Sequence, residues 1–238
     1  MAQEIFKRTE KKYLLSAQQY RAFLAALEPF VKRDRYFESD IMSLYYDTPD
    51  YRLIRASIEK PVFKEKIRLR SYGVPRSADD VFLEIKRKYK GVVYKRRSVM
   101  PLSRAAGFPE TARDTQIEKE LAWCFDFYEG LAPQMLITYK RHAYTALSDP
   151  ELRITFDSEL LFRDYDLRLD KGHLRTKAAA ARRADNGDKD SGGYTALAGG
   201  AARRAENLSR FVLKIRHSVP HAAFGKGARA EQDNGLTA

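Results

Sequence analysis

Lysine and arginine recur at every second residue in several segments of this sequence. Four consecutive even-numbered positions of Val62–Tyr72 carry them, and the same spacing continues in Val81–Lys90 and Val92–Met100. Because successive side chains of a β-strand point to opposite faces, each segment places these cations on one face. They are Lys64, Lys66, Arg68, Arg70, Lys86, Lys88, Lys95 and Arg97. Guanidinium and ammonium groups are the usual partners of phosphate oxygens, so the pattern predicts a site for a phosphorylated ligand.

Two carboxylates alternate in phase with such cations. Glu84 shares a face with Lys86, and Glu10 shares a face with Lys12 in another alternating segment, Glu4–Leu15. Burying cations costs free energy unless anions compensate them, so these carboxylates either balance the cations or anchor a metal ion. The alternation itself fits an ordinary solvated sheet face, an open basic face for nucleic acid, or a closed barrel with the cations inward.

The elements that must position these side chains are mainly strands. The pattern predicts a short strand at Ile41–Asp47, strands at Leu136–Thr145 and Leu152–Glu159, and a hairpin turn at Lys90-Gly91. Each of these segments is rich in β-branched and aromatic residues. The chain is therefore expected to be α+β, mainly antiparallel β with a few helices.

Two helices are expected beside the strands. Ser16 is suited to cap the start of one, and Asp114 the start of the other. Their apolar stripes are Tyr20, Phe23, Leu24 and Leu27 in the first and Ile117, Leu121 and Phe125 in the second. Both helices can then cover the apolar side of the sheet.

The bulk composition points to an anionic partner. The chain has 238 residues, with 44 Lys and Arg against 32 Asp and Glu, a formal net charge of +12. A charge of this sign favours nucleic acid, acidic lipid or phosphate compounds, and a solvated basic surface is the plain alternative. There is no Ser-His-Asp set, no Cys/His metal cluster and no phosphate-binding glycine loop.

Some residues are expected to have structural roles only. Cys124 lies in an apolar segment and is expected to be a buried, inert thiol. Lys64, Lys66 and Lys90 are expected to be solvated, and His142 is expected to be structural.

The chain divides into two unlike parts, 1–171 and 172–238. The second part contains only Tyr194, Phe211 and Phe224 as aromatics, and it carries Ala-, Gly- and Arg-rich stretches. Such a composition buries little apolar area, so this tail is expected to be disordered or loosely helical.

Several motifs in the first part together resemble the vacuolar transporter chaperone (VTC) domain family. They are Arg8-x-Glu10-x-Lys12-Tyr13, residues 44–48 (Leu-Tyr-Tyr-Asp-Thr), residues 67–73 with Arg-x-Arg, the basic strand 82–88, residues 139–144 and residues 153–157. Each motif is modest alone, but their order and spacing make the resemblance specific over about residues 4–171.

The resemblance implies a fold and an activity. VTC domains belong to the triphosphate tunnel metalloenzyme group, also called CYTH-like, whose fold is an antiparallel β-barrel tunnel with covering helices. The implied activity is that of a polyphosphate polymerase, which transfers the γ-phosphate of ATP to a growing polyphosphate chain with a divalent metal, Mn²⁺ or Mg²⁺. Carried over by position, the residues that grip phosphates are Lys12, Arg68, Arg70, Lys86 and Arg141. Lys88, Lys95 and Arg97 are expected to guide the product, and Glu10 and Glu84 are the metal candidates.

The tail departs from the family pattern. The family ends with a Glu-x-Lys strand, a short helix and a Ser-Phe-Ser-Lys-Tyr motif, which are absent here, so the barrel is expected to be incomplete. Read one nucleotide later, residues 186–192 can encode Met-Glu-Ile-Lys-Ile-Pro-Gly, residues 195–198 Pro-Leu-Trp-Leu, and residues 211–216 Ser-Phe-Ser-Lys-Tyr-Gly. The sequence therefore predicts that 172–238 is a frameshifted reading of the domain's last strands and helix.

Two other functions remain open, namely hydrolysis of a triphosphate or organophosphate and non-catalytic binding of a polyanion. The expected partners are ATP and polyphosphate. Nucleic acid is disfavoured because the basic strands show no exposed aromatic platform for stacking bases. No signal peptide or membrane span is apparent in the sequence, so a cytoplasmic location is expected, with attachment to a membrane protein as an alternative.

Overall fold

A computed structural model describes residues 8–59, 62–90, 92–172 and 211–218 of the chain. The strands in these ranges form one antiparallel sheet with the order β1-β8-β7-β6-β2-β3-β4-β5. Their bounds are β1 Arg8–Leu15, β2 Val31–Asp47, β3 Phe63–Tyr72, β4 Asp80–Tyr89, β5 Val92–Pro101, β6 Ala132–Ala146, β7 Leu152–Arg163 and β8 Phe211–Ser218. This arrangement confirms the mainly antiparallel β fold.

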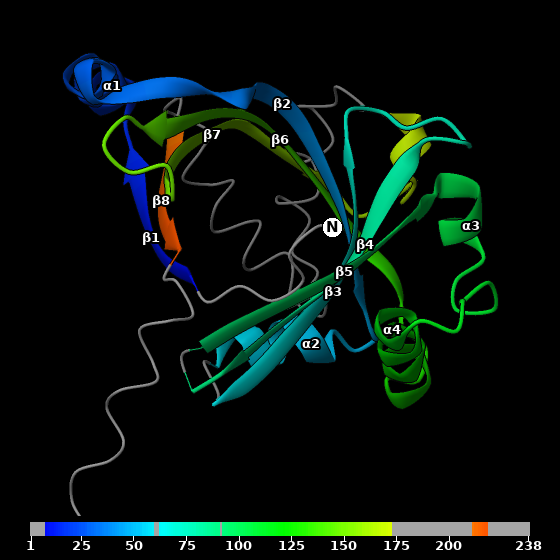
Figure 1. The fold of residues 1–238 in the computed structure, drawn as a ribbon. Coiled ribbons are helices and arrows are strands. Elements are labelled where there is room, and N and C mark those ends of the chain that lie inside the picture. The colour runs from blue at the N-terminus through cyan, green and yellow to red at the C-terminus, as the bar shows by residue number, and fades with distance from the viewer. Residues whose placement is uncertain (1–7, 60–61, 91, 173–210, 219–238) are drawn as a thin grey trace, which may run out of the picture.

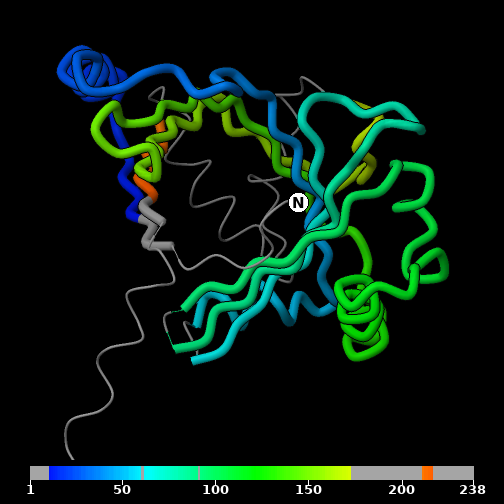
Figure 2. Tube along the Cα trace, in the orientation of Figure 1, coloured from blue at the N-terminus to red at the C-terminus, as the bar shows by residue number. Residues whose placement is uncertain are grey.

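The sheet is strongly curved, and the helices α1, α3 and α4 lie on its outer side (Figure 1). The helices are α1 Ala17–Leu27, α2 Arg52–Ile58, α3 Leu102–Ala106 and α4 Gln116–Phe127, with 3-10 turns η1 Glu28–Phe30 and η2 Leu169–Lys171. The trace in Figure 2 shows the arch of β2, β6 and β7 and the second layer of β3, β4 and β5. In the described strands the edges β1 and β5 do not pair, so hydrogen bonds do not close the sheet into a barrel.

The main apolar core fills the outer side of β3, β4 and β5. Ile67, Leu83 and Ile85 are at most 1% exposed there, and they belong to one cluster with Leu121 and Cys124 of α4. Because every second residue of these strands is apolar, burying this face under α4 leaves the other face to the charged residues. Cys124 is fully buried, as expected, and burial raises the pKa of its thiol to about 11, which disfavours the reactive thiolate.

Helix α1 covers the outer side of the other half of the sheet. Ser16 caps it as expected, since its Oγ accepts a hydrogen bond from the Gln19 backbone and the Gln19 side chain accepts one from the Ser16 backbone. Its aromatic residues pack onto Phe156 of β7 and Leu213 of β8. No helix in the described part of the chain has the length and apolar character to cross a bilayer.

Two expectations from the sequence were wrong in detail. The short strand expected at Ile41–Asp47 is the end of the 17-residue β2, which begins at Val31. The second helix is capped by Thr115 rather than Asp114, because the Thr115 side chain accepts the Glu118 backbone hydrogen bond. Asp114 instead forms an exposed ion pair with Lys119.

The tail also differs from its expectation. Residues 211–218 form β8, a strand inserted between β1 and β7, rather than a disordered or loosely helical segment. Alternating apolar residues explain this, because Leu213 and Ile215 join the cluster under α1. The remaining tail residues, 173–210 and 219–238, lie outside the described part of the chain.

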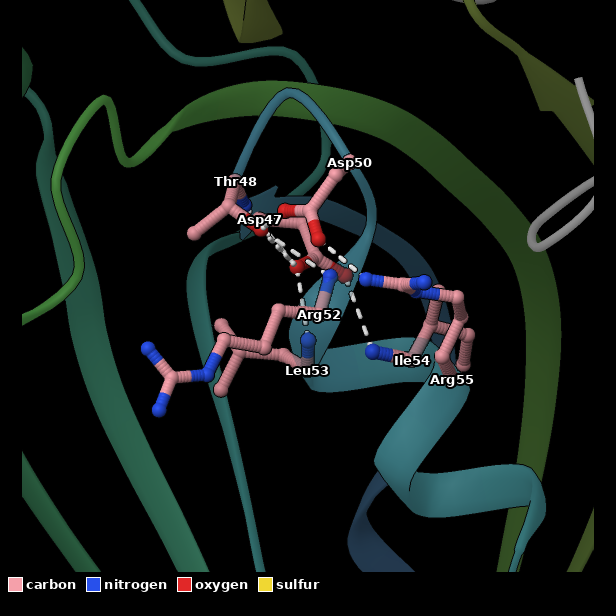
Figure 3. A network of polar contacts seen from close by, with 7 residues as sticks. All are labelled: Asp47, Thr48, Asp50, Arg52, Leu53, Ile54 and Arg55. Atoms are coloured by element: carbon pink, nitrogen blue, oxygen red, sulfur yellow. Dashed lines mark hydrogen bonds and ion pairs between the residues drawn. The ribbon is translucent and has the colours of Figure 1, made fainter.

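The turn that follows β2 is organised by one buried carboxylate (Figure 3). Asp47 is fully buried, and its oxygens accept hydrogen bonds from the backbone N–H groups of Thr48, Leu53 and Ile54 at 2.8 to 2.9 Å. Two of these donors open α2 and have no partner within the helix. Asp47 therefore fixes α2 against the end of β2, where Ile54 packs on Met135 of β6.

Replacing Asp47 with alanine is expected to lower the free energy of unfolding by about 3 kcal/mol, because three buried donors lose their acceptor. Urea unfolding followed by circular dichroism measures this. The control Asp50→Ala removes an exposed carboxylate paired with Arg55 and should cost much less. Equal losses in the two variants would contradict the role assigned to Asp47.

Candidate anion-binding site

The residues predicted to bind phosphate groups lie on one face of the sheet. Residues directly opposite each other in antiparallel strands point to the same side, and alternation continues along each strand. Arg68 lies opposite Tyr45 and Glu84, and Arg70 lies opposite Ser43. The pairing of the other strands places further cations on this same side of the sheet. We call this side the cationic face. Its cations are Lys12, Arg68, Arg70, Lys86, Lys88, Lys95, Arg97, Arg141 and Lys214. This is the face opposite the one that packs against α1 and α4.

On one half of the cationic face, a carboxylate joins two cations from neighbouring strands. Arg68 of β3 donates from Nε to Oε2 of Glu84 at 2.8 Å, and Lys95 of β5 forms an ion pair with Oε1. The guanidinium also donates from Nη1 to the Tyr45 hydroxyl at 3.1 Å. Burial raises the pKa of the Glu84 carboxyl, but Arg68, Arg70 and Lys95 outweigh it and lower that pKa to about 2. Glu84 is therefore an anion at neutral pH.

The other half of the cationic face repeats this arrangement. Arg141 of β6 donates from Nε and Nη2 to the two oxygens of Asp157 of β7, at 2.6 and 2.8 Å, and Lys214 of β8 pairs with the same carboxylate. The Tyr139 ring lies 5.2 Å from the Arg141 guanidinium carbon. Burial raises the pKa of Asp157, but its hydrogen bond and attraction to Arg141 and the charge of Lys214 bring the net shift downward.

The two halves are close enough to act on each other electrostatically. Burial lowers the pKa of Lys66, and the charges of neighbouring Lys64, Lys12 and Arg68 lower it further. Lys12 belongs to the edge strand β1 and also contributes to the lowered pKa of Lys214. Tyr139 of β6 likewise acts on both Arg68 and Arg141. Charged groups of β1, β3, β6 and β8 therefore lie within electrostatic range of one another.

The remaining predicted residues are arranged around this region. Arg70 is buried and donates from Nε to Ser43 at 3.3 Å, and Lys86 lies opposite Lys95. Lys88 is exposed near the hairpin, and Arg97 lies over the Phe82 ring at 5.0 Å. Lys64 and Lys66 are half-buried rather than solvated, so that expectation was wrong for both, whereas Lys90 is exposed at the turn. The side chain of Glu10 lies outside the described part of the chain.

The outer side of the sheet also has arginines, on β4, β5 and α3, but they are paired with carboxylates of α4 and of β3. Arg87 contacts Glu65 and Glu120, Arg96 contacts Glu120, and Arg104 contacts Glu118. His142 lies on this side as well and stacks on Phe37 at 5.0 Å, in a structural role. These outer pairs hold the sheet to α4, so an anionic ligand would find its cations on the other face.

The described residues do not assemble a metal site. Within the part of the chain that the structure describes, no three His, Cys, Asp or Glu side chains gather where they could hold an ion. Both oxygens of Glu84 already contact cations, which favours charge balance over metal binding for this residue. The predicted metal role of Glu84 therefore does not fit this geometry.

Sequence reasoning missed four residues of the cationic face. Tyr45, Tyr139 and Asp157 lie within recognised motifs, but nothing in their spacing indicated contacts to arginines. Lys214 lies in the tail, where the composition had argued against a strand. The alternation of residues 211–216 was the one signal that could have placed it.

The chain is a curved antiparallel β-sheet protein with arginines and lysines along one face of the sheet. The chain belongs to the VTC domain family, whose sequence profile matches residues 7–185. Among curated proteins, none matches it in sequence.

Two solved structures have a similar chain path. One is a putative adenylate cyclase from Bacillus halodurans, at 11% identity and a TM-score of 0.49, covering 91% of this chain and 82% of that one. The other is a putative adenylyl cyclase from Hippeastrum, described as having a dominant triphosphatase activity, at 13% identity and a TM-score of 0.46, covering 92% and 82%. The family assignment rests on the sequence match.

The affinity for a polyanion is expected to fall between pH 7 and pH 9. Burial raises the pKa of Tyr45, but Arg68, Arg70 and Lys66 outweigh it and lower that pKa to about 8. Burial likewise lowers the pKa values of Lys95 and Lys214 to about 8. Above this pH the lysines lose their charge and Tyr45 gains a negative one, and both changes oppose anion binding.

The variant Tyr45→Phe isolates the tyrosine's part in this pH dependence. Calorimetric titration with tripolyphosphate measures how much the affinity falls from pH 7 to pH 9. This loss of affinity should be about fivefold smaller in Tyr45→Phe than in the unchanged chain. The ligand's own ionisation is common to both proteins and cancels in the comparison. Identical pH dependence in the two proteins would contradict a phenolate that competes with the ligand.

Proposed function

We propose that this chain is a polyphosphate polymerase domain that transfers the γ-phosphate of ATP to the end of a polyphosphate chain. The observation that carries the proposal is the convergence of Arg68, Arg70 and Arg141 on one face of a VTC family sheet. A linear polyphosphate carries negative charge on every unit, so it suits cations from several strands better than a single phosphate does.

The proposed chemistry needs mainly positioning and charge neutralisation. A terminal oxygen of the polyphosphate attacks the γ-phosphorus, the bond from that phosphorus to the bridging β–γ oxygen breaks, and ADP leaves with the bonding electrons. Arg68, Arg70, Lys86, Arg141 and Lys12 would hold the phosphate oxygens and neutralise the charge that develops there. Lys88, Lys95 and Arg97 would contact the chain beyond the reacting group. No step is assigned to Mn²⁺ or Mg²⁺, because the described carboxylates do not fit a metal site.

Hydrolysis is the second candidate from the same site. The cationic face would hold a triphosphate in the same way, and none of its described side chains distinguishes a phosphate oxygen from water as the attacking group. A polyanion-binding module without turnover is the third candidate. For either alternative, the same residues bind the ligand.

The tail limits the activity that we expect of the chain as given. We propose that residues 172–238 are a frameshifted reading, because the motifs with which the family ends can be read from this segment one nucleotide later. The family match covers only the first part of it, up to residue 185. The chain as given would then be weakly active. A location in the cytoplasm, or against a membrane protein that receives the product, also belongs to this proposal.

One assay separates the three functions. The frame-corrected protein is incubated with ATP and Mn²⁺, and the products are resolved by gel electrophoresis and chromatography. Long-chain polyphosphate with ADP supports the polymerase, whereas phosphate released without polymer supports a hydrolase. Tight tripolyphosphate binding with no turnover would leave the binding module as the function.

A further inference from the structure

The two halves of the cationic face contain the same set of interacting side chains. In each half a tyrosine contacts an arginine, and a carboxylate pairs with that arginine and with a lysine. They are Tyr45, Arg68, Glu84 and Lys95 on β2 to β5, and Tyr139, Arg141, Asp157 and Lys214 on β6 to β8. In both sets, one carboxylate joins an arginine and a lysine.

Asp157 is well placed to orient its partners. The residue is 5% exposed, and it engages the Nε and Nη2 atoms of Arg141 from one side. A guanidinium held along this edge presents its Nη1–Nη2 edge to a further anion. The Lys214 ammonium is held by the oxygen Oδ2 that also accepts from Nη2, so both cations are fixed relative to each other.

We propose that Asp157 is a positioning residue for anion binding, holding Arg141 and Lys214 in the geometry that a phosphate chain meets, and that Glu84 does the same for Arg68 and Lys95. This inference rests on the proposed function, but its test is equilibrium binding rather than catalysis. If the carboxylate only repelled the anionic ligand, removing the carboxylate would tighten binding. If the carboxylate positions the arginine and the lysine, removing it weakens binding, because these two like charges then move apart.

The test is calorimetric titration of the full chain with inorganic tripolyphosphate, without metal. Asp157→Asn is expected to weaken binding about tenfold, although it raises the net charge by one. The control Asp114→Asn makes the same chemical change at an exposed residue paired with Lys119 and should leave the affinity unchanged. Glu84→Gln should also weaken binding, and it tests the proposal independently if Asp157→Asn fails to fold in a thermal melt.

A second measurement separates positioning from a general structural defect. In a chain that already carries Arg141→Ala and Lys214→Ala, Asp157→Asn should no longer weaken binding, because the partners through which Asp157 acts are gone. Tighter binding by Asp157→Asn and Glu84→Gln, or no binding by the unchanged chain, would overturn the proposal. Tripolyphosphate binding without polymer formation would count against the polymerase and leave this inference standing.

Discussion

Replacing Arg68 with alanine is expected to weaken tripolyphosphate binding about 100-fold, because charge-assisted contacts from a half-buried guanidinium are lost. Arg68 lies at the centre of the cationic face, between Tyr45 and Glu84. Lysine at this position would keep the charge but could not reach both neighbours in the same way, so Arg68→Lys should recover only part of the affinity. Isothermal titration calorimetry at fixed salt gives both values.

Two controls separate this effect from charge and from stability. Arg55→Ala removes an arginine that forms an exposed pair with Asp50 and should leave binding unchanged. The double variant Arg68→Met with Glu84→Gln keeps the net charge and avoids leaving a buried carboxylate short of a partner. It should lose affinity about as much as Arg68→Ala. If Arg68→Ala or the double variant bound tripolyphosphate within twofold of the unchanged chain, Arg68 would not be part of the binding site.

Restoring the reading frame after residue 171 is expected to raise ATP-dependent polyphosphate synthesis at least about 100-fold over the chain as given. The reason is that the shifted frame supplies a carboxylate and a lysine in the strand that the family uses, and groups of this kind contribute about 100-fold to 1000-fold to turnover. The measurement compares the two proteins with ATP and Mn²⁺ at equal concentration. A matched control carries the same corrected tail together with Arg141→Ala and should be inactive.

Resequencing the gene around codons 165–180 tests the origin of the tail directly. We expect a nucleotide gained or lost near Gly172. An intact frame that encodes the given tail, together with equal activity of both proteins, would contradict the frameshift. In that case β8 as described would be the native strand.

Local sequence patterns predicted the part of the fold that carries most of the cationic face. In β3, β4 and β5 the alternation is strict, and the strands that pair in the sheet also follow one another in the sequence. The long β2 was only partly predicted, because residues 31–40 are mostly charged and exposed and lack an apolar period. Helix α2 was missed because it has seven residues and depends on Asp47, a residue outside the helix.

The contacts within the candidate site were harder to predict than its cations. Alternation placed Arg68 and Glu84 on the same side of their strands, but it could not show that Asp157 meets Arg141. That contact depends on the register between β6 and β7, which contains a bulge between Thr138 and Lys140. Lys214 depends on pairing of the tail with β1 and β7, a contact between segments far apart in the sequence.

The most direct test of the account is a crystal structure of the chain with bound tripolyphosphate. We expect successive phosphate groups along the cationic face, with oxygens within hydrogen-bond distance of Arg68 and Arg141 at the same time. Tripolyphosphate bound on the side of α1 and α4, or contacting only one of the two arginines, would contradict a shared site for linked phosphates.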